Sequence, residues 1–207
     1  MDATHARVRH LPVRWGLLAA SVAVIAAIVW LRGHAPSFDD KLAPFVLSGG
    51  VDQRVEARNF AVRVKRLKLA RAYRTPGPGF DSGPVQARAD GVWLSVLVDV
   101  EPTREPGYVS AWLRAADGRT FVAASGDRPR VGNLNFANVQ LATGLVGQGA
   151  YFFDLPEDAL ADARLLFFWG LSKPGDMDHL VEIDPGLDVA AVRALREGAQ
   201  PVIDLVP

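Results

Sequence analysis

The sequence predicts an all-β protein: an antiparallel β-sandwich that follows one N-terminal transmembrane α-helix. The helix is predicted by residues 15–31, a run of 17 residues without a charge. The sandwich is predicted by short segments, spread over residues 60–206, in which apolar and polar residues alternate. Turn-forming Gly, Pro, Asn and Asp separate these segments, and little of this part of the chain has helical periodicity.

Residues 15–31 have the length and the ends of a helix that crosses a membrane. At 1.5 Å of rise per residue they span roughly 25 Å, close to the hydrocarbon thickness of a thin bilayer. Trp15 and Trp30 lie at the two ends, where indole rings favour the membrane–water interface. The run is longer than the apolar core of a typical cleaved secretory signal. We therefore expect an uncleaved signal anchor, with a cleaved signal ending near Gly33-His34-Ala35 as the alternative.

Charges on the two sides of the helix predict its orientation. The segment before the helix carries Arg7, Arg9 and Arg14, whereas the cations after it are offset by Asp39 and Asp40. Lys and Arg are enriched on the cytoplasmic side of membrane helices, so the N-terminus is expected in the cytoplasm. The predicted parts are a cytoplasmic head (1–14), the transmembrane helix (15–31), a linker (32–44) and an extracytoplasmic β-sandwich domain (45–207).

The phase of the apolar alternation locates the strands. Apolar residues occupy even positions in 60–64 and odd positions in 67–69, which predicts a β-bulge near Lys65–Arg66. Residues 92–100 form the clearest strand, and Asp117-Gly118 predicts a tight hairpin. Further elements are expected as strands at 138–141, 151–155, 165–171, 180–183 and 202–206, and as a short helix capped by Asp188.

Three segments carry a resemblance to a known group of proteins. They are Gly91-Val-Trp-Leu-Ser-Val-Leu-Val-Asp-Val100, Tyr151-Phe-Phe-Asp-Leu-Pro156 and Ala163-Arg-Leu-Leu-Phe167. The part of the chain after the helix resembles the immunoglobulin-like extracytoplasmic domains of actinobacterial membrane-anchored and secreted proteins, the mycobacterial secreted antigen type among them. This resemblance implies an immunoglobulin-like β-sandwich and brings no catalytic motif with it.

Composition and motifs argue against an enzyme or a cofactor protein. The sequence has no cysteine, and its formal net charge of zero argues against a nucleic-acid binder. Only His179 of the four histidines falls in the predicted sandwich, and hydrolase, zinc and phosphate-loop motifs are missing. A hydrolase centred on His179 is kept as the least favoured alternative. Gly175-Asp-Met-Asp-His179 lacks calcium-loop spacing, so we expect a solvated acidic loop, no metal site and no cofactor.

The most unusual charge feature is a basic stretch. Residues 54–74 contain eight cations, whereas residues 151–207 contain eleven acids and four bases. Either these cations form the outer face of a strand beside acidic neighbours, or they form a patch that contacts anionic lipid head groups or an acidic partner. The stretch consists of Arg54, Arg58, Arg63, Lys65, Arg66, Lys68, Arg71 and Arg74.

Adjacent aromatic residues place rings on both faces of two predicted strands. Phe152-Phe153 and Phe167-Phe168 each place one ring on either face, because successive side chains of a strand point to opposite sides. One ring of each pair is therefore expected to be exposed or to be covered by another group.

These observations predict a single-pass, membrane-anchored binding module, an accessory subunit of a membrane or cell-envelope complex that contacts a protein partner. The favoured alternative is a module that binds a lipid or a cell-wall fragment, and this alternative requires a cavity between the two sheets. No enzymatic activity and no nucleic-acid partner are expected.

Overall fold

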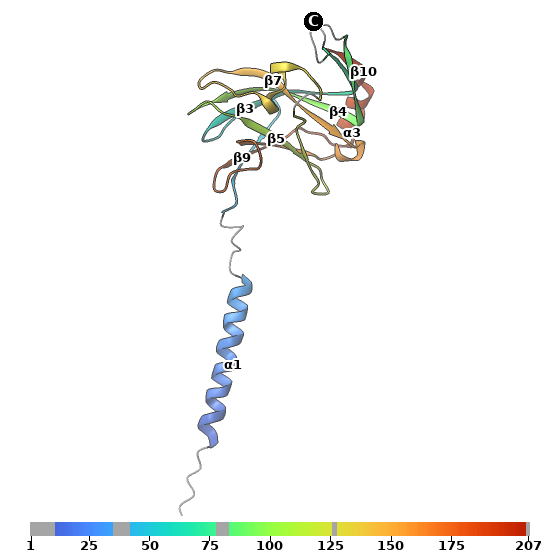
Figure 1. The fold of residues 1–207 in the computed structure, drawn as a ribbon. Helices are drawn as coiled ribbons and strands as arrows, with labels where there is room; N and C mark the ends of the chain where they lie inside the picture. The colour runs from blue at the N-terminus through green and yellow to red at the C-terminus, as the bar shows by residue number, and fades with distance from the viewer. Residues whose placement is uncertain (1–10, 35–41, 78–82, 126–127, 206–207) are drawn as a thin grey trace, which may run out of the picture. The chain divides into compact units, whose positions relative to one another are not determined.

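The computed structural model describes residues 11–34, 42–77, 83–125 and 128–205, and the chain divides into two units, 1–42 and 43–207 (Figure 1). Helix α1 (Leu11–His34) belongs to the first unit. This helix extends beyond the predicted segment 15–31 by four residues at its N-terminal end and by three at its C-terminal end. At its C-terminal end, Nδ1 of His34 hydrogen-bonds the carbonyl oxygen of Trp30 at 2.8 Å.

Helix α1 has the length and apolarity of a membrane-spanning segment over residues 15–34, a property that secretory signal sequences share. Trp15 and Trp30 are 71% and 63% exposed in this unit. Most of the predicted head (1–14) and most of the predicted linker (32–44) lie outside the described residues.

The second unit consists of two five-stranded sheets (Figure 1). One has the order β1-β9-β8-β5-β6, and the other has the order β10-β3-β4-β7 with β2 beside β3. The strands are β1 (Phe45–Gly50), β2 (Arg54–Glu56), β3 (Phe60–Thr75), β4 (Val85–Pro102), β5 (Val109–Arg114), β6 (Thr120–Val122), β7 (Gly147–Leu155), β8 (Arg164–Trp169), β9 (His179–Asp184) and β10 (Gln200–Asp204). The helical elements are η1 (Gly132–Leu134), η2 (Phe136–Asn138), η3 (Glu157–Ala159) and α3 (Val189–Glu197).

The predicted β-sandwich is confirmed, but its pairing is not purely antiparallel. Strand β1 pairs in parallel with β9, and β10 pairs in parallel with β3. No tight hairpin joins these strands to their partners: β1 precedes β9 by most of the domain, and β10 follows helix α3. Parallel pairs need such long connections, whereas antiparallel neighbours can be joined by a two-residue turn.

Strands β3 and β4 form the longest pair, and their register contains the predicted bulge. Val64 lies opposite Val98 and Arg66 lies opposite Leu97, so Lys65 is the extra residue. The bulge near Lys65–Arg66 is therefore confirmed. It allows apolar residues on both sides of it to reach the core despite their change of phase.

Two further local predictions are confirmed. Strands β5 and β6 pair in an antiparallel hairpin whose turn contains Gly118 at a φ of +88°, a conformation that favours glycine. Helix α3 begins after Asp188, whose side chain accepts a hydrogen bond from the backbone N–H of Ala191 at 2.7 Å.

The prediction of a strand at residues 138–141 is wrong. The chain forms the short 3-10 helix η2 there, and only a single bridge joins Leu141 to Gly107. The 3-10 turn is fixed by Asn135, whose side chain accepts from the N–H of Ala137 at 3.1 Å and donates to the carbonyl of Ala124 at 2.9 Å. A side chain that caps a turn in this way competes with strand pairing.

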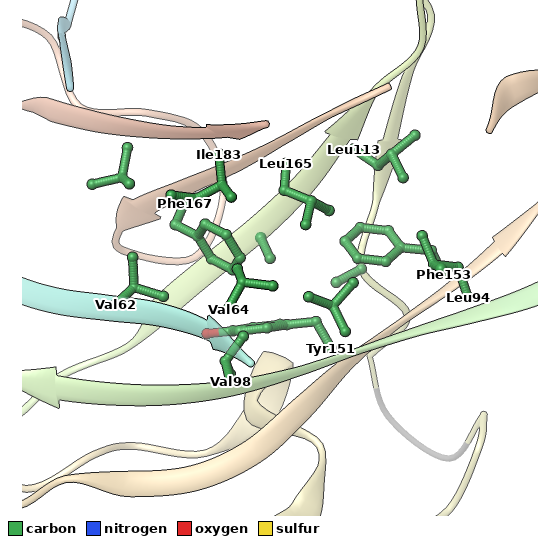
Figure 2. Packing of buried hydrophobic residues seen from close by; sticks show 14 of the residues in the cluster. Val62, Val64, Leu94, Val98, Leu113, Tyr151, Phe153, Leu165, Phe167 and Ile183 are labelled. Carbon is green, nitrogen blue, oxygen red and sulfur yellow. The ribbon is translucent and has the colours of Figure 1, made fainter. Parts of the chain in front are cut away.

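The main core fills the space between the two sheets (Figure 2). Phe167 and Ile183 of one sheet face Val64 and Tyr151 of the other, and the rings of Tyr151 and Phe167 meet edge-on with centroids 5.6 Å apart. All four residues are fully buried. Burying large apolar side chains in this way supplies most of the favourable free energy of folding.

Both rings of each aromatic pair are buried, because small clusters of the same chain cover the outer faces of the sheets. Phe153 and Phe167 point into the main core, whereas Phe152 packs with Tyr73 in a second cluster. Phe168 packs in a third cluster with Leu166, Leu180 and Trp112.

Tyr151 links the two sheets by a hydrogen bond within the core. Its hydroxyl, carried by β7, donates to the carbonyl oxygen of Val109 on β5 at 2.5 Å. The side chain is fully buried, and burial raises the pKa of Tyr151 well above its ordinary value, since the ionised phenolate would lose its hydration.

We predict that Tyr151→Phe lowers the free energy of unfolding by about 1–2 kcal/mol, because the carbonyl of Val109 loses its buried donor. The native pKa lies above that of the unfolded state, so the hydroxyl's contribution is complete below about pH 10 and is lost as the unfolded tyrosine ionises at higher pH. Urea unfolding at pH 7 to 11 should therefore show a difference from the wild type that shrinks above about pH 10. A difference that stays constant to pH 11 would contradict this assignment; Tyr108→Phe, at a half-buried tyrosine, is the control.

Candidate functional site

Four of the eight predicted contact residues are held in ion pairs on the domain surface. These pairs support the interpretation that the basic stretch lies beside acidic neighbours, although most of the acids come from β4 and the β1–β2 turn and not from the acidic last quarter of the chain. The pairs are Arg54–Glu101 at 2.8 Å, Arg63–Asp52 at 2.8 Å, Lys65–Asp99 at 3.6 Å and Arg74–Asp204 at 3.4 Å.

The other four cations, Arg58, Arg66, Lys68 and Arg71, are exposed and have no ion pair among the described residues. Arg66 and Lys68 follow the bulge on the outer face of β3, where Arg66 lies opposite Leu97 and Lys68 lies opposite Ser95. Arg58 and Arg71 lie away from this pair of residues. The structure therefore brings together only part of the predicted patch.

Lys65 and Arg66 border an open groove on the outer face of β3, β4 and β7. This outer groove has a volume of about 700 Å³. Its lining is Lys65, Arg66, Leu97, Val98, Asp99, Leu134, Gln148 and Gly149.

A smaller apolar pocket adjoins the outer groove and shares Leu97 and Leu134 with it. This side pocket has a volume of about 100 Å³. Its lining is Lys68, Tyr73, Ser95, Leu97, Leu134, Ala150, Phe152, Ile203 and Leu205. The two hollows adjoin across Leu97 and Leu134, with Lys65 and Arg66 beside the groove and Lys68 beside the apolar pocket.

The floor of the side pocket is made of rings that hold one another in place. Tyr73 packs edge-on against Phe152, with centroids 5.3 Å apart and planes at 88°, and against Trp93 at 6.1 Å. The indole N–H of Trp93 donates to the carbonyl of Ala87 at 3.2 Å, and the guanidinium of Arg128 lies 5.7 Å above the indole ring. The floor is therefore formed before any ligand binds.

The wall of the site is the η1–η2 segment, which supplies Leu134. Asn135 is 2% exposed and fixes the turn through its two side-chain hydrogen bonds. Phe136 then packs against the backbone of Gly149 on β7, where an added Cβ would lie 2.5 Å from the ring. Glycine is required there for this close approach, and the approach places Leu134, 40% exposed, at the edge of the sheet.

Tyr73 brings an unpartnered polar group to the site. Its hydroxyl is buried and has no hydrogen bond among the described residues. The neighbouring hydroxyl of Ser95 donates to the carbonyl of Lys68 at 3.4 Å. Burial raises the pKa of Tyr73, because its ionised form would lose hydration. The nearby Ser95 hydroxyl stabilises the ionised form and so lowers the pKa in part. A buried hydroxyl without a partner costs about 1–3 kcal/mol, and the buried indole N–H of Trp112, outside the site, is a second such group among the described residues.

His179 and the acidic residues near it are engaged in structural contacts. Nδ1 of His179 accepts from the backbone N–H of Arg58 at 2.9 Å. Asp178 accepts from Asn59 at 3.3 Å and from the N–H of His179 at 2.8 Å. Within the part of the chain that the structure describes, no hydroxyl or carboxylate bonds the imidazole, and no three His, Asp or Glu side chains gather where they could hold a metal ion. The hydrolase alternative finds no support in this geometry.

Sequence reasoning missed the apolar half of the site. Leu97, Leu134 and Phe152 come from segments that are far apart in the chain, and they meet only through the sheet. One signal was available: Gly147 and Gly149 alternate within a strand, and glycine in a strand often marks a close approach of another segment.

Solved structures similar to this chain are β-sandwich proteins, whereas no protein-family model and no curated protein sequence matches it. An uncharacterized β-sandwich protein from Clostridium difficile 630 has 8% identity and a TM-score of 0.42, over 72% of this chain and 99% of that one. The yjhA protein from Bacillus subtilis has 15% identity and a TM-score of 0.45, over 65% and 99%. The secreted protein MPT63 from Mycobacterium tuberculosis has 14% identity and a TM-score of 0.43, over 68% and 98%.

The similarity to MPT63 agrees with the expected resemblance only at the level of a β-sandwich. Identities of 15% or less and TM-scores below 0.5 establish neither a family nor a function. The fold assignment therefore rests on the strand pairing of this chain.

We predict that Gly149→Ala destabilises the domain by about 1–3 kcal/mol, because the new methyl group overlaps the ring of Phe136. Urea unfolding measures the effect. Gly50→Ala is the matched control, since a Cβ at Gly50 meets no atom within 4 Å. Equal stability of the two variants would show that Phe136 does not need the glycine.

Proposed function

We propose that this chain is a single-pass membrane protein, with its N-terminus in the cytoplasm and its β-sandwich outside, that binds a partner protein through the outer groove. In this proposal it serves as an accessory subunit of a membrane or cell-envelope complex. The observation that carries the proposal is the exposed pair of cations without ion partners, Arg66 and Lys68, beside a preformed apolar pocket.

The length and ends of α1 support the membrane anchor. Its 24 residues span roughly 36 Å, enough to cross the hydrocarbon core of a bilayer. Trp15 and Trp30 stand where indole rings anchor a helix at the two interfaces, and the arginines of the head favour a cytoplasmic N-terminus.

The strand order supports an immunoglobulin-like scaffold in both sheets, with an added strand at one edge of the second. Strands β6, β5, β8 and β9 follow the order of the sheet formed by the C and the F–G strands of immunoglobulin domains. In the other sheet β3, β4 and β7 follow the A-B-E part of the A-B-E-D order, and β10 is added in parallel beside β3.

A module that binds a lipid or a cell-wall fragment is the second candidate. A ligand held between the two sheets would require a cavity there, but the facing residues form one buried cluster. What favours a small ligand is the apolar side pocket on the outer face.

The test is the behaviour of the full chain, tagged at its C-terminus, in the cells that produce it. It should remain with membranes after carbonate extraction, and a partner should co-purify with it in mild detergent. Arg66→Glu with Lys68→Glu should lower the yield of that partner roughly tenfold, because two attractive contacts become repulsive.

Arg58→Glu with Arg71→Glu is the control, since it changes the net charge equally at two exposed cations outside the outer groove. Release of the chain by carbonate would contradict the anchor. A monodisperse monomer without a partner would contradict the accessory-subunit function.

A further inference from the structure

We infer that the outer groove binds an acidic segment of the partner protein and that one large apolar side chain of this segment enters the side pocket. This inference rests on the proposed function and names the chemistry that the site recognises. It follows from the size of the pocket, the charge around it, the rigidity of its floor and the openness of the groove.

The size of the side pocket matches one side chain. Its volume is about 100 Å³, somewhat smaller than the roughly 150 Å³ cavity that holds a benzene molecule in another protein. The terminal part of a leucine or phenylalanine side chain fits this space, whereas most of a long acyl chain would remain in water. A single apolar anchor in a pocket, surrounded by polar contacts, is the usual arrangement of the energetically dominant residues in protein interfaces.

The charge around the groove selects an acidic segment. Lys65, Arg66 and Lys68 contribute three positive charges and Asp99 contributes one negative charge, which leaves a net charge of 3 − 1 = +2. Asp99 is engaged by Lys65, so Arg66 and Lys68 remain available for carboxylates of the partner. Such complementary charges steer association and exclude basic segments.

The rigidity of the floor limits the cost of binding. Tyr73 and Phe152 are already packed edge-on and fully buried, so they lose little conformational freedom when the pocket is filled. Leu134, at 40% exposure, lines the pocket opposite this floor and can contact the incoming side chain. The amide of Gln148 lines the outer groove and can pair with the backbone of an extended segment.

The experiment measures binding of three short labelled peptides to the full chain in phosphatidylcholine nanodiscs by fluorescence anisotropy. The first probe is acetyl-Asp-Glu-Phe-Glu-Asp-amide, the second has Ser in place of Phe, and the third has Lys in place of every acid. We expect saturable binding of the first peptide, measurable binding of the second that is at least about tenfold weaker, and no binding of the third.

Variants separate the two halves of the site. Arg66→Glu with Lys68→Glu should weaken the first peptide at least about tenfold, and Arg58→Glu with Arg71→Glu should leave it within about twofold. Leu134→Ser should weaken the Phe peptide and leave the Ser peptide unchanged. Thermal unfolding of each variant confirms that it is folded.

Three outcomes would overturn the inference. The first is no saturable binding of the first peptide, and the second is an equal loss of its affinity in the two charge-reversal variants. The third is displacement of the peptide by palmitate, where palmitate binds more tightly and is weakened by the same substitutions. This third outcome would assign the site to a lipid. If a partner still co-purifies in any of these cases, the accessory-subunit function stands. If the peptide binds to a chain that carbonate releases from membranes, only the membrane anchor is refuted.

Discussion

The bulge in the β3–β4 pair is the constraint on which the site depends. Val64 and Leu67 both contribute to the core, although they are three residues apart and would otherwise point to opposite faces. The extra residue at Lys65 resolves this conflict by leaving Lys65 and Arg66 together on the outer side. Strict alternation would instead bury the charge of Arg66, which costs several kcal/mol for an unpaired ion. The demands of the core therefore place the cations at the groove.

The sheet that carries the groove is buried on its core face and, in part, on its outer face. Its outer cluster of Tyr73, Trp93 and Phe152 is covered from one side by the segment that includes Val131 and from the other by Ile203 and its neighbours. The two covers do not close over the cluster, and the side pocket lies between Leu134 and Ile203. An apolar floor with an incomplete cover is suited to receive an apolar group from another molecule.

Local features of the fold could be predicted from the sequence, and contacts between distant segments could not. The bulge, the turn at Gly118 and the cap at Asp188 each follow from short patterns with a known backbone geometry. The strand expected at 138–141 does not form because Asn135 caps a 3-10 turn before it, and Phe136 of that turn packs on Gly149. The basic stretch was predicted from the sequence. Which of its cations are neutralised depends on pairs between distant residues, such as Arg54 and Glu101, 47 positions apart.

We propose that the outer groove, and not the opposite sheet, contacts the partner. Site-specific photocrosslinking in intact cells tests it most directly, with a benzophenone side chain placed at Leu134 in the groove wall or at Val122 on the other sheet. Both residues are exposed, at 40% and 63%. We expect a discrete crosslinked adduct from position 134, lost when Arg66 and Lys68 are reversed to Glu, and none from position 122. An adduct from position 122 alone, or equal adducts from both, would contradict it.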